Sequence, residues 1–344
     1  MLVHRGIAES SGRPALLFAL LSLLSSAGCA HTIEVAPLAI RDESPVVRTF
    51  GLPVNAGADV VSQGETTLDF RTTYSSDYAL SADSLPDKVL FDGETARLSL
   101  HGRVGLGSGV ELGLEIPWLA HSGGVLDRFI LGYHQLFGFD QGSRDLARNN
   151  QLDFSYRRDG VERFGVRQAG AGLGDVQLSA GIRLLQGGPA GLALALRASL
   201  ELPTGDPRKL MGSGSFDLAL YLSASAHLAL PLGRAEAWAS LGALGMTDGA
   251  LLPDLQNHVV VFGEFGLGWR VVPGLALKVQ VDAHSTFFSD TRTVPMGMPV
   301  AQFIGGVSVA LWRNTSLDFG LVEDLTVMAA PDVGLHAALR SFFD

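Results

Sequence analysis

The chain has 344 residues, of which 47% are hydrophobic and 17% are charged, with 42 glycines and a formal net charge of -10. This acidic balance argues against a nucleic-acid-binding role, because phosphate recognition requires clustered Lys and Arg side chains. After the N-terminus, no apolar run reaches the roughly twenty residues that a helix needs to span a bilayer. A chain of this length can nevertheless form one large barrel domain.

Residues 1–29 have the pattern of a secretory signal peptide. Arg5 and Arg13 precede a short apolar core that begins at Ala15, and small residues follow it. This order of charged, apolar and small residues is typical of exported proteins. We therefore expect the mature chain to lie outside the cytoplasm.

The only cysteine, Cys29, follows Ala27-Gly28 and resembles the lipobox of bacterial lipoproteins, in which the cysteine thiol is acylated. Ser26 stands where that motif usually has Leu, so two alternatives remain, lipidation of Cys29 or ordinary cleavage near Ala30. With a single cysteine, no intramolecular disulfide can form in the oxidising compartment.

Residues 30–64 contain Pro37, Pro45, Pro53 and several glycines without a regular period. Such composition favours irregular structure. We expect this stretch to be a periplasmic leader.

Long segments in which every second residue is apolar begin at Thr66. The clearest lie between Asp175 and Leu230, where the apolar residues of one segment include Leu192, Leu194 and Leu196. Period-two alternation indicates strands, and strands of about ten to fifteen residues with one apolar face are typical of membrane β-barrels. We predict twelve strands, at 66–74, 94–106, 109–117, 174–186, 191–203, 215–230, 235–246, 258–271, 275–288, 300–312, 315–324 and 333–343.

The predicted connections alternate strictly between short and long. Ser108-Gly109, Pro273-Gly274 and Arg313-Asn314 are tight turns, whereas the links 75–93, 118–173, 204–214, 247–257, 289–299 and 325–332 are longer. Outer-membrane barrels have short periplasmic turns and longer outer loops. The sequence therefore predicts an all-β fold, an antiparallel transmembrane barrel over 65–344, with both chain ends on the periplasmic side.

Charges in these strands fall on the side opposite to the apolar residues. A soluble β-sandwich also alternates, but the long strands, the signal peptide and the alternating loop lengths favour a barrel, in which Arg or Lys facing lipid at mid-depth would cost roughly 2–4 kcal/mol. The predicted lumen charges are Asp69, Arg71, Arg97, Arg103, Glu111, Glu115, Asp175, Arg183, Arg197, Glu201, Asp217, Glu236, Glu264, Arg270, Lys278, Asp282, Asp318 and Arg340.

Aromatic residues at the strand ends support the membrane assignment, because Trp and Tyr concentrate at bilayer interfaces. We expect Trp269 and Trp312 in the periplasmic belt, and Tyr74, Trp118 and Phe287 in the outer belt. The C-terminal residues 339–344 resemble the assembly signal of outer-membrane barrels. Expected partners are therefore outer-membrane lipid and the barrel assembly machinery.

The 118–173 insert is too long to be a simple connector. Leu126, Phe129, Ile130, Tyr133 and Phe137 have helical spacing and predict a short helix. A charged tract from Arg144 to Arg163 follows. The insert is interpreted either as a lid or plug over the lumen or as a folded external loop, and we favour the external loop.

Val125-Leu-Asp-Arg-Phe-Ile130, Tyr133-His134, Phe137-Gly138 and Gly172-Leu-Gly-Asp175 resemble a family of bacterial outer-membrane barrels known only as a domain of unknown function. The segments Glu201–Asp206 and Gly212–Asp217 are also similar to corners of barrels linked to aromatic-compound degradation. Neither resemblance implies a catalytic residue. They imply a barrel whose glycine-containing corners place Asp175 and Asp217 at the start of strands.

No enzymatic or metal-binding pattern emerges. Ser225 and His227 share one face, as do Asp282 and His284, but nothing in the sequence brings the pairs together as a nucleophile and its base. The histidines lack paired ligand spacing, and no cofactor is expected. Two functions remain, an outer-membrane pore or ligand conduit and a non-transporting structural barrel whose lumen is closed by paired charges.

Overall fold

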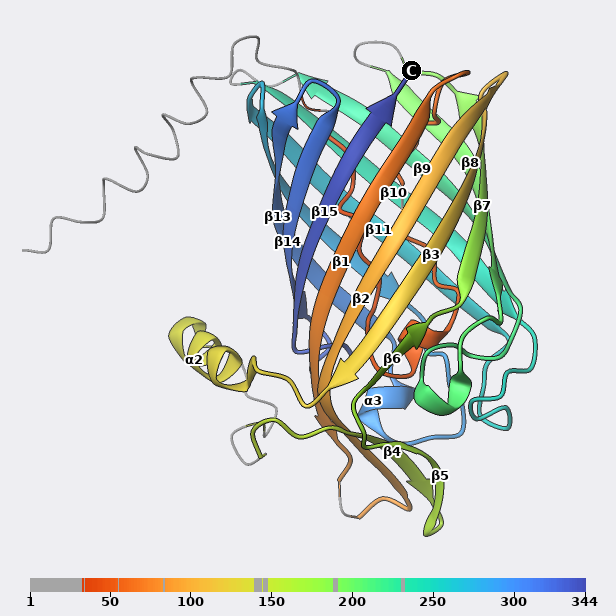
Figure 1. Ribbon diagram of the computed structural model, residues 1–344, viewed down its shortest axis with the longest axis vertical. Helices are drawn as coiled ribbons and strands as arrows, with labels where there is room; N and C mark the ends of the chain where they lie inside the picture. Colours follow the sequence, from red (N-terminus) through yellow and green to blue (C-terminus); the bar gives the residue numbers. More distant parts are fainter. Residues whose placement is uncertain are drawn as a thin grey trace, which may run out of the picture.

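The computed structural model describes residues 33, 35–54, 56–82, 84–138, 144, 148–187, 191–229 and 233–344. Twelve of the strands in these residues close into a single antiparallel barrel (Figure 1). They are β1 (Thr66–Leu80), β2 (Asp87–Gly107), β3 (Val110–Ser122), β7 (Val176–Leu185), β8 (Leu192–Leu202), β9 (Asp217–Ala229), β10 (Arg234–Met246), β11 (Val259–Val272), β12 (Leu275–His284), β13 (Val300–Trp312), β14 (Thr315–Asp324) and β15 (Val333–Phe343).

The barrel closes where the first strand meets the last. Asp69 of β1 lies opposite Arg340 of β15 on one side and opposite His101 of β2 on the other. Every barrel strand therefore has two neighbours, so no open edge with unpaired backbone groups remains. The predicted twelve-stranded antiparallel barrel is confirmed, although β1 and β2 extend well past the expected 66–74 and 94–106.

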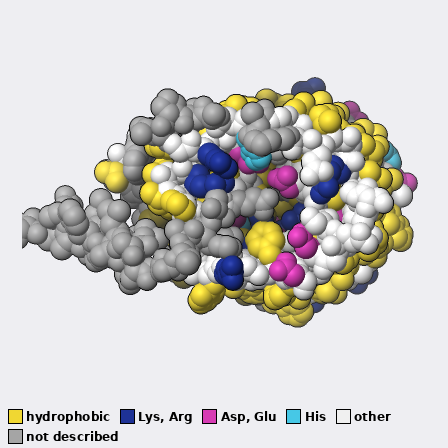
Figure 2. Space-filling view, turned by 90° about the horizontal axis from the view of Figure 1, so that it is seen from above, with side chains coloured by type: hydrophobic (Ala, Val, Ile, Leu, Met, Phe, Trp, Pro, Cys, Tyr) yellow, Lys and Arg dark blue, Asp and Glu magenta, His cyan; other side chains and the backbone are white. Residues whose placement is uncertain are grey.

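The barrel has a short-turn end, at the top of Figure 1 together with the C-terminus, and a loop end at the bottom. Along each strand, exposed apolar residues alternate with buried polar ones. Leu218 and Leu220 of β9 are 57% and 55% exposed, whereas Asp217 and Ser223 are buried. In Figure 2, which looks onto the short-turn end, apolar side chains surround the outside and charged side chains gather within the mouth. This distribution suits a wall whose outer face meets lipid.

The insert between β3 and β7 holds the helix α2 (Asp127–Phe137) and the strands β4 (Asp153–Arg158), β5 (Val161–Val166) and β6 (Gly170–Leu173). Strand β4 pairs with the part of β2 that extends beyond the barrel, and β6 pairs with β3. The predicted short helix is therefore present. No helix in the described ranges has the length and hydrophobicity needed to cross a bilayer.

Candidate functional site: the barrel lumen

The lumen is filled by residues 33–62, which we name the lumen segment (residues 34 and 55 are not described). It enters at the short-turn end, where the Ile33 N–H donates to the Pro273 carbonyl at 2.8 Å. It reaches the loop end, where Arg48 pairs with Asp77 at 2.6 Å. It then returns, and the Val61 N–H donates to Glu111 at 2.7 Å. The red ribbon inside the barrel in Figure 1 follows this path.

This location differs from the periplasmic leader expected for residues 30–64. Pro and Gly indicate irregular structure, but they do not distinguish an irregular segment in solvent from one inside a wide barrel. Burial distinguishes them, because Leu38, Val46 and Phe50 are all completely buried. The lumen segment is therefore part of the folded barrel.

A groove of glycines in the wall receives the first arm of the lumen segment. Gly306 and Gly320 lie opposite each other on β13 and β14, at the level of Gly268 on β11. A β-carbon added at Gly306 would lie 2.6 Å from the Leu38 side chain, and one at Gly268 would lie 2.1 Å from Val35. Both distances are too short for real carbon contacts, so only glycine at these positions leaves room for the lumen segment.

Four charged side chains of the lumen segment pair with the wall. Arg41 lies 2.5 Å from Glu115, Glu43 lies 2.8 Å from Arg97, and Asp42 lies 2.9 Å from His284. Arg48 pairs with Asp77, as described above. Buried charges persist only when they are paired or hydrated, so the wall charges and the lumen segment depend on each other.

The predicted lumen charges near the short-turn end meet both the wall and the lumen segment. Arg197 donates to Glu111 at 2.5 Å and also to the Gly57 and Asp59 carbonyls at 2.8 and 2.6 Å. Arg103 lies 3.4 Å from the same Glu111. Arg183 donates to the Val60 carbonyl at 2.7 Å, so this arginine holds backbone rather than a carboxylate.

The remaining predicted charges do not gather into one cluster. Lys278 lies 3.6 Å from Asp318, and Asp282 accepts from Gln280 at 3.0 Å. Within the described residues, no three His, Cys, Asp or Glu side chains come together as metal ligands. Cys29, the predicted lipidation site, lies outside the described residues.

At the two corners singled out in the sequence, the carboxylates of Asp175 and Asp217 accept hydrogen bonds from backbone N–H groups. Asp175 accepts the N–H groups of Gly205 and Ser213 at 2.6 and 2.9 Å. Asp217 accepts the N–H of Gly51 in the lumen segment at 2.8 Å. A β-carbon added at Gly51 would lie 2.8 Å from that of Asp217. The corners therefore position the lumen segment as well as turn the chain.

Aromatic side chains close the loop end. Phe50 of the lumen segment stacks on Phe287 with ring centroids 5.1 Å apart and meets Phe288 edge-on at 5.9 Å. Phe154 of β4 lies under the Arg48 guanidinium at 5.5 Å. The placement of Phe287 in the outer membrane belt was therefore wrong, because its ring is turned inward and is 1% exposed. Trp118, by contrast, is 49% exposed on the outer wall.

The insert combines features of the two interpretations made from the sequence, a lid over the lumen and a folded external loop. Phe154 and Tyr156 of β4 are fully buried in the apolar cluster that also contains Phe50 and Val47 of the lumen segment. The helix α2 extends sideways from the wall at the loop end and does not lie over the opening (Figure 1). The β4 strand thus helps to close the mouth, whereas the helix is external.

One member of each polar pair weighed as a catalytic candidate contacts the lumen segment, whereas His227 pairs with Glu236 at 3.1 Å and Asp282 accepts from Gln280. The Ser225 hydroxyl oxygen accepts the Ala58 N–H at 3.2 Å. His284 is bonded to Asp42 at 2.9 Å, and the Ser44 hydroxyl donates to the same carboxylate. Ser44 and His284 therefore both hold the Asp42 carboxylate of the lumen segment.

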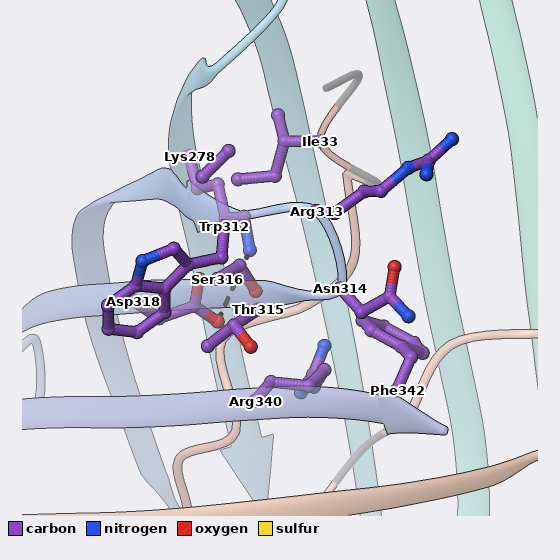
Figure 3. A pocket seen from close by; sticks show the side chains of 11 residues that line it. Ile33, Lys278, Trp312, Arg313, Asn314, Thr315, Ser316, Asp318, Arg340 and Phe342 are labelled. Carbon is purple, nitrogen blue, oxygen red and sulfur yellow. Dashed lines mark ion pairs between the residues drawn. The ribbon is translucent and has the colours of Figure 1, made fainter. Parts of the chain in front are cut away.

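A cavity of about 230 Å³ opens at the short-turn end beside Ile33, the first described residue of the lumen segment (Figure 3). Lys278, Arg313 and Arg340 contribute positive charge to its lining, and Asp318 contributes negative charge. Ion pairs connect Lys278 to Asp318 at 3.6 Å and Arg340 to Asp69 at 3.0 Å. This cavity lies at the end of the barrel where the lumen segment enters.

Sequence reasoning missed four buried charged residues of the lumen segment, namely Arg41, Asp42, Glu43 and Arg48. A signal for them existed, because these four charges stand among apolar residues such as Leu38, Ile40, Val46 and Val47 in a stretch predicted to be solvated. A solvated leader has no need for such apolar content.

Comparison with known proteins gives one family and a set of solved barrels. A family model described as a protein of unknown function, DUF3187, matches residues 16–343. No curated protein shows significant sequence similarity to the chain. The COG4313 outer membrane channel from Pseudomonas putida F1 is 15% identical, with a TM-score of 0.52, over 83% of this chain and 98% of its own.

Two further solved structures are more distant. The KdgM porin in complex with disordered oligogalacturonate is 9% identical, with a TM-score of 0.42, over 81% of this chain and 99% of its own. The CymD monoaromatic hydrocarbon channel is 12% identical, with a TM-score of 0.33, over 90% of this chain and 94% of its own. The likeness to the Pseudomonas channel shows that the fold is that of an outer-membrane barrel, and the two distant structures add no further argument.

Proposed function

The chain belongs to the DUF3187 family of proteins of unknown function, and we propose that it is an outer-membrane conduit for a small ligand that is held closed by its own lumen segment. In this proposal the short-turn end and both chain ends face the periplasm, and the loop end faces outward. Residues 1–29 act as the export signal, with Cys29 as the candidate for acylation.

One observation carries the proposal. The backbone ladder of the barrel closes through β1 and β15 without any strand from the lumen segment. Apart from the backbone hydrogen bond of Ile33 to Pro273, the contacts described above hold the segment through side chains and through its fit to the wall. A twelve-stranded barrel is wider than one whose interior side chains alone can fill. The segment can therefore leave the lumen while the wall stays intact, which a conduit requires.

A non-transporting structural barrel is the second candidate. The buried ion pairs between lumen segment and wall favour it, because a permanently packed lumen needs every charge satisfied. We propose no catalytic role in either case, since Ser225 and His284 are used to hold the lumen segment.

Planar-bilayer recordings distinguish the two candidates. The Arg48→Gln variant removes the ion pair that holds the tip of the lumen segment against Asp77. We expect the wild type to open rarely and Arg48→Gln to open more often, with steps of the same conductance. The matched control is Arg208→Gln, because Arg208 is exposed in the 204–214 loop. Silence of the wild type, of Arg48→Gln and of a variant lacking residues 35–61 would establish the structural barrel instead.

A further inference from the structure

The helix α2 is attached to the outer wall of the barrel by two carboxylates. Glu94 lies on the outward face of β2, because side chains alternate along a strand and Thr95 and Arg97 point into the lumen. Its carboxylate accepts the N–H groups of Val125 and Leu126, which immediately precede the helix, at 2.8 and 2.6 Å. The N-terminal end of α2 is therefore held on the lipid side of the wall.

A second attachment holds the middle of the helix. The Tyr133 hydroxyl is hydrogen-bonded to Glu323, near the outer end of β14. Glu323 follows Phe319 at an even spacing, which places both on the outward face, and Phe319 is 48% exposed. Between β2 and β14 lie only β1 and β15, so both attachments of α2 are on the same side of the barrel.

Only part of the apolar surface of α2 is covered by protein. Ile130 is completely buried, whereas Val125, Phe129 and Leu136 are 78%, 51% and 78% exposed. Successive helical residues are about 100° apart, so Phe129 and Leu136 lie only about 20° apart on one stripe of α2. Val125, just before the helix, adds a further exposed apolar side chain. Figure 1 shows that this helix extends sideways from the barrel at the level where the strands end.

We propose that α2 is an interfacial helix that lies in the outer leaflet of the membrane and extends the lipid contact of the barrel. Its exposed stripe continues the lipid-facing surface, because Leu335 of β15 and Leu325 just beyond β14 are exposed apolar residues of the same wall region. An amphipathic helix buries such a stripe at the headgroup boundary and keeps its polar side in water. Arg128, about 100° from the stripe, is placed to contact lipid phosphates. The inference needs the barrel to be in a membrane and does not depend on conduction.

Spin-label accessibility tests this placement. Leu136→Cys and its neighbour Gln135→Cys differ by one position but point to the apolar stripe and to the polar side of α2 respectively. Both are made with Cys29→Ser, so that the label is unique. The protein is reconstituted in nanodiscs of phosphatidylethanolamine and phosphatidylglycerol, and access of oxygen and of a water-soluble nickel complex to each label is measured.

We expect the ratio of oxygen to nickel access to be several-fold higher for Leu136→Cys than for Gln135→Cys, because oxygen concentrates in lipid. Equal ratios with strong nickel access at both positions would overturn the proposal. Protection of Leu136→Cys from both reagents, with dipolar broadening that disappears on dilution with unlabelled protein, would mean that a second copy covers the stripe. That result would also overturn it.

Discussion

Arg197 is the side chain that connects the wall most directly to the lumen segment. It holds Glu111 and two backbone carbonyls of the segment at the same time. Arg183 on the adjacent β7 and Arg103 on β2 contact the same region. Removing its guanidinium therefore leaves buried acceptors without a donor, and this is the most costly type of single change in a packed polar network.

Arg197→Ala should lower the free energy of unfolding by about 3 kcal/mol, the scale of a broken buried ion pair. It should also raise the frequency of channel opening, because the returning arm loses its anchor at Gly57 and Asp59. Thermal unfolding in detergent, followed by gel mobility, measures the first effect and bilayer recording measures the second. Arg208→Ala is the control. An unfolding temperature equal to that of the wild type would show that Arg197 is hydrated rather than packed.

Acidic residues beyond the loop end make stability depend on pH. Burial raises the pKa of Asp92 to about 7, and it raises the pKa of Asp332 well above the ordinary value. A carboxyl whose pKa is higher in the folded than in the unfolded state keeps its proton only when folded. It therefore favours folding at low pH, and stability falls as the pH rises from about 4 to about 7.

Asp92→Asn should reduce this dependence, because Asn cannot ionise in the buried position. We expect the wild type to unfold at a lower temperature at pH 8 than at pH 5, and the variant to show a smaller difference. The comparison variant is Asp254→Asn, since hydrogen bonding to Arg163 lowers the pKa of Asp254. This carboxyl is therefore already ionised at pH 5 and does not change the stability between pH 5 and pH 8. If Asp92→Asn leaves the pH dependence of the unfolding temperature unchanged, groups other than Asp92 cause it.

At the scale of elements, the inner face of β11 to β14 is shaped by glycines rather than by side chains. Gly268, Gly306 and Gly320 remove volume where Val35, Leu38 and Ile40 pass. Glycine weakens a strand, because it adds backbone entropy and no packing. The three glycines lie at one level of the wall, with Lys278 between Gly268 and Gly306, and they leave space for the lumen segment.

Gly268→Val should displace the first arm of the lumen segment, since the new β-carbon would lie 2.1 Å from Val35. Hydrogen–deuterium exchange of the backbone between residues 35 and 43 should become several-fold faster. The matched control is Gly245→Val, because a β-carbon at Gly245 meets no atom closer than the Leu218 carbonyl at 3.8 Å. If both variants exchange at the same rate, the glycine groove does not hold the arm.

At the scale of the whole molecule, the barrel and the lumen segment are separable in principle, because the ladder closes through β1 and β15 alone. We predict that a variant lacking residues 35–61 still assembles into a barrel. Its mobility on detergent gels should change on boiling, as for the wild type, but it should unfold at a lower temperature. Failure of this variant to show a heat-dependent mobility would mean that the lumen segment is required to close the barrel.

The sequence alone determined the barrel and the direction of its side chains. Alternation in β8 and β9 identifies both faces, because a bilayer excludes charge from one of them. The strict alternation of short turns and long loops then fixes an antiparallel order in which sequence neighbours pair. The charged residues Arg97, Glu115, Arg197 and Asp217 were therefore assignable to the lumen without a structure.

Only the tertiary structure decided what those charges contact. Glu115, predicted as a lumen charge, pairs with Arg71 of β1 and with Arg41 of the lumen segment. Residues 33–62 have no secondary-structure period, and a local pattern carries no information about which surface an irregular segment will occupy. Phe287 was misplaced for the same reason, since its position depends on Phe50, which is distant in sequence. The closed lumen is thus a property of contacts across the barrel, which become definite only when the strands have closed around the segment.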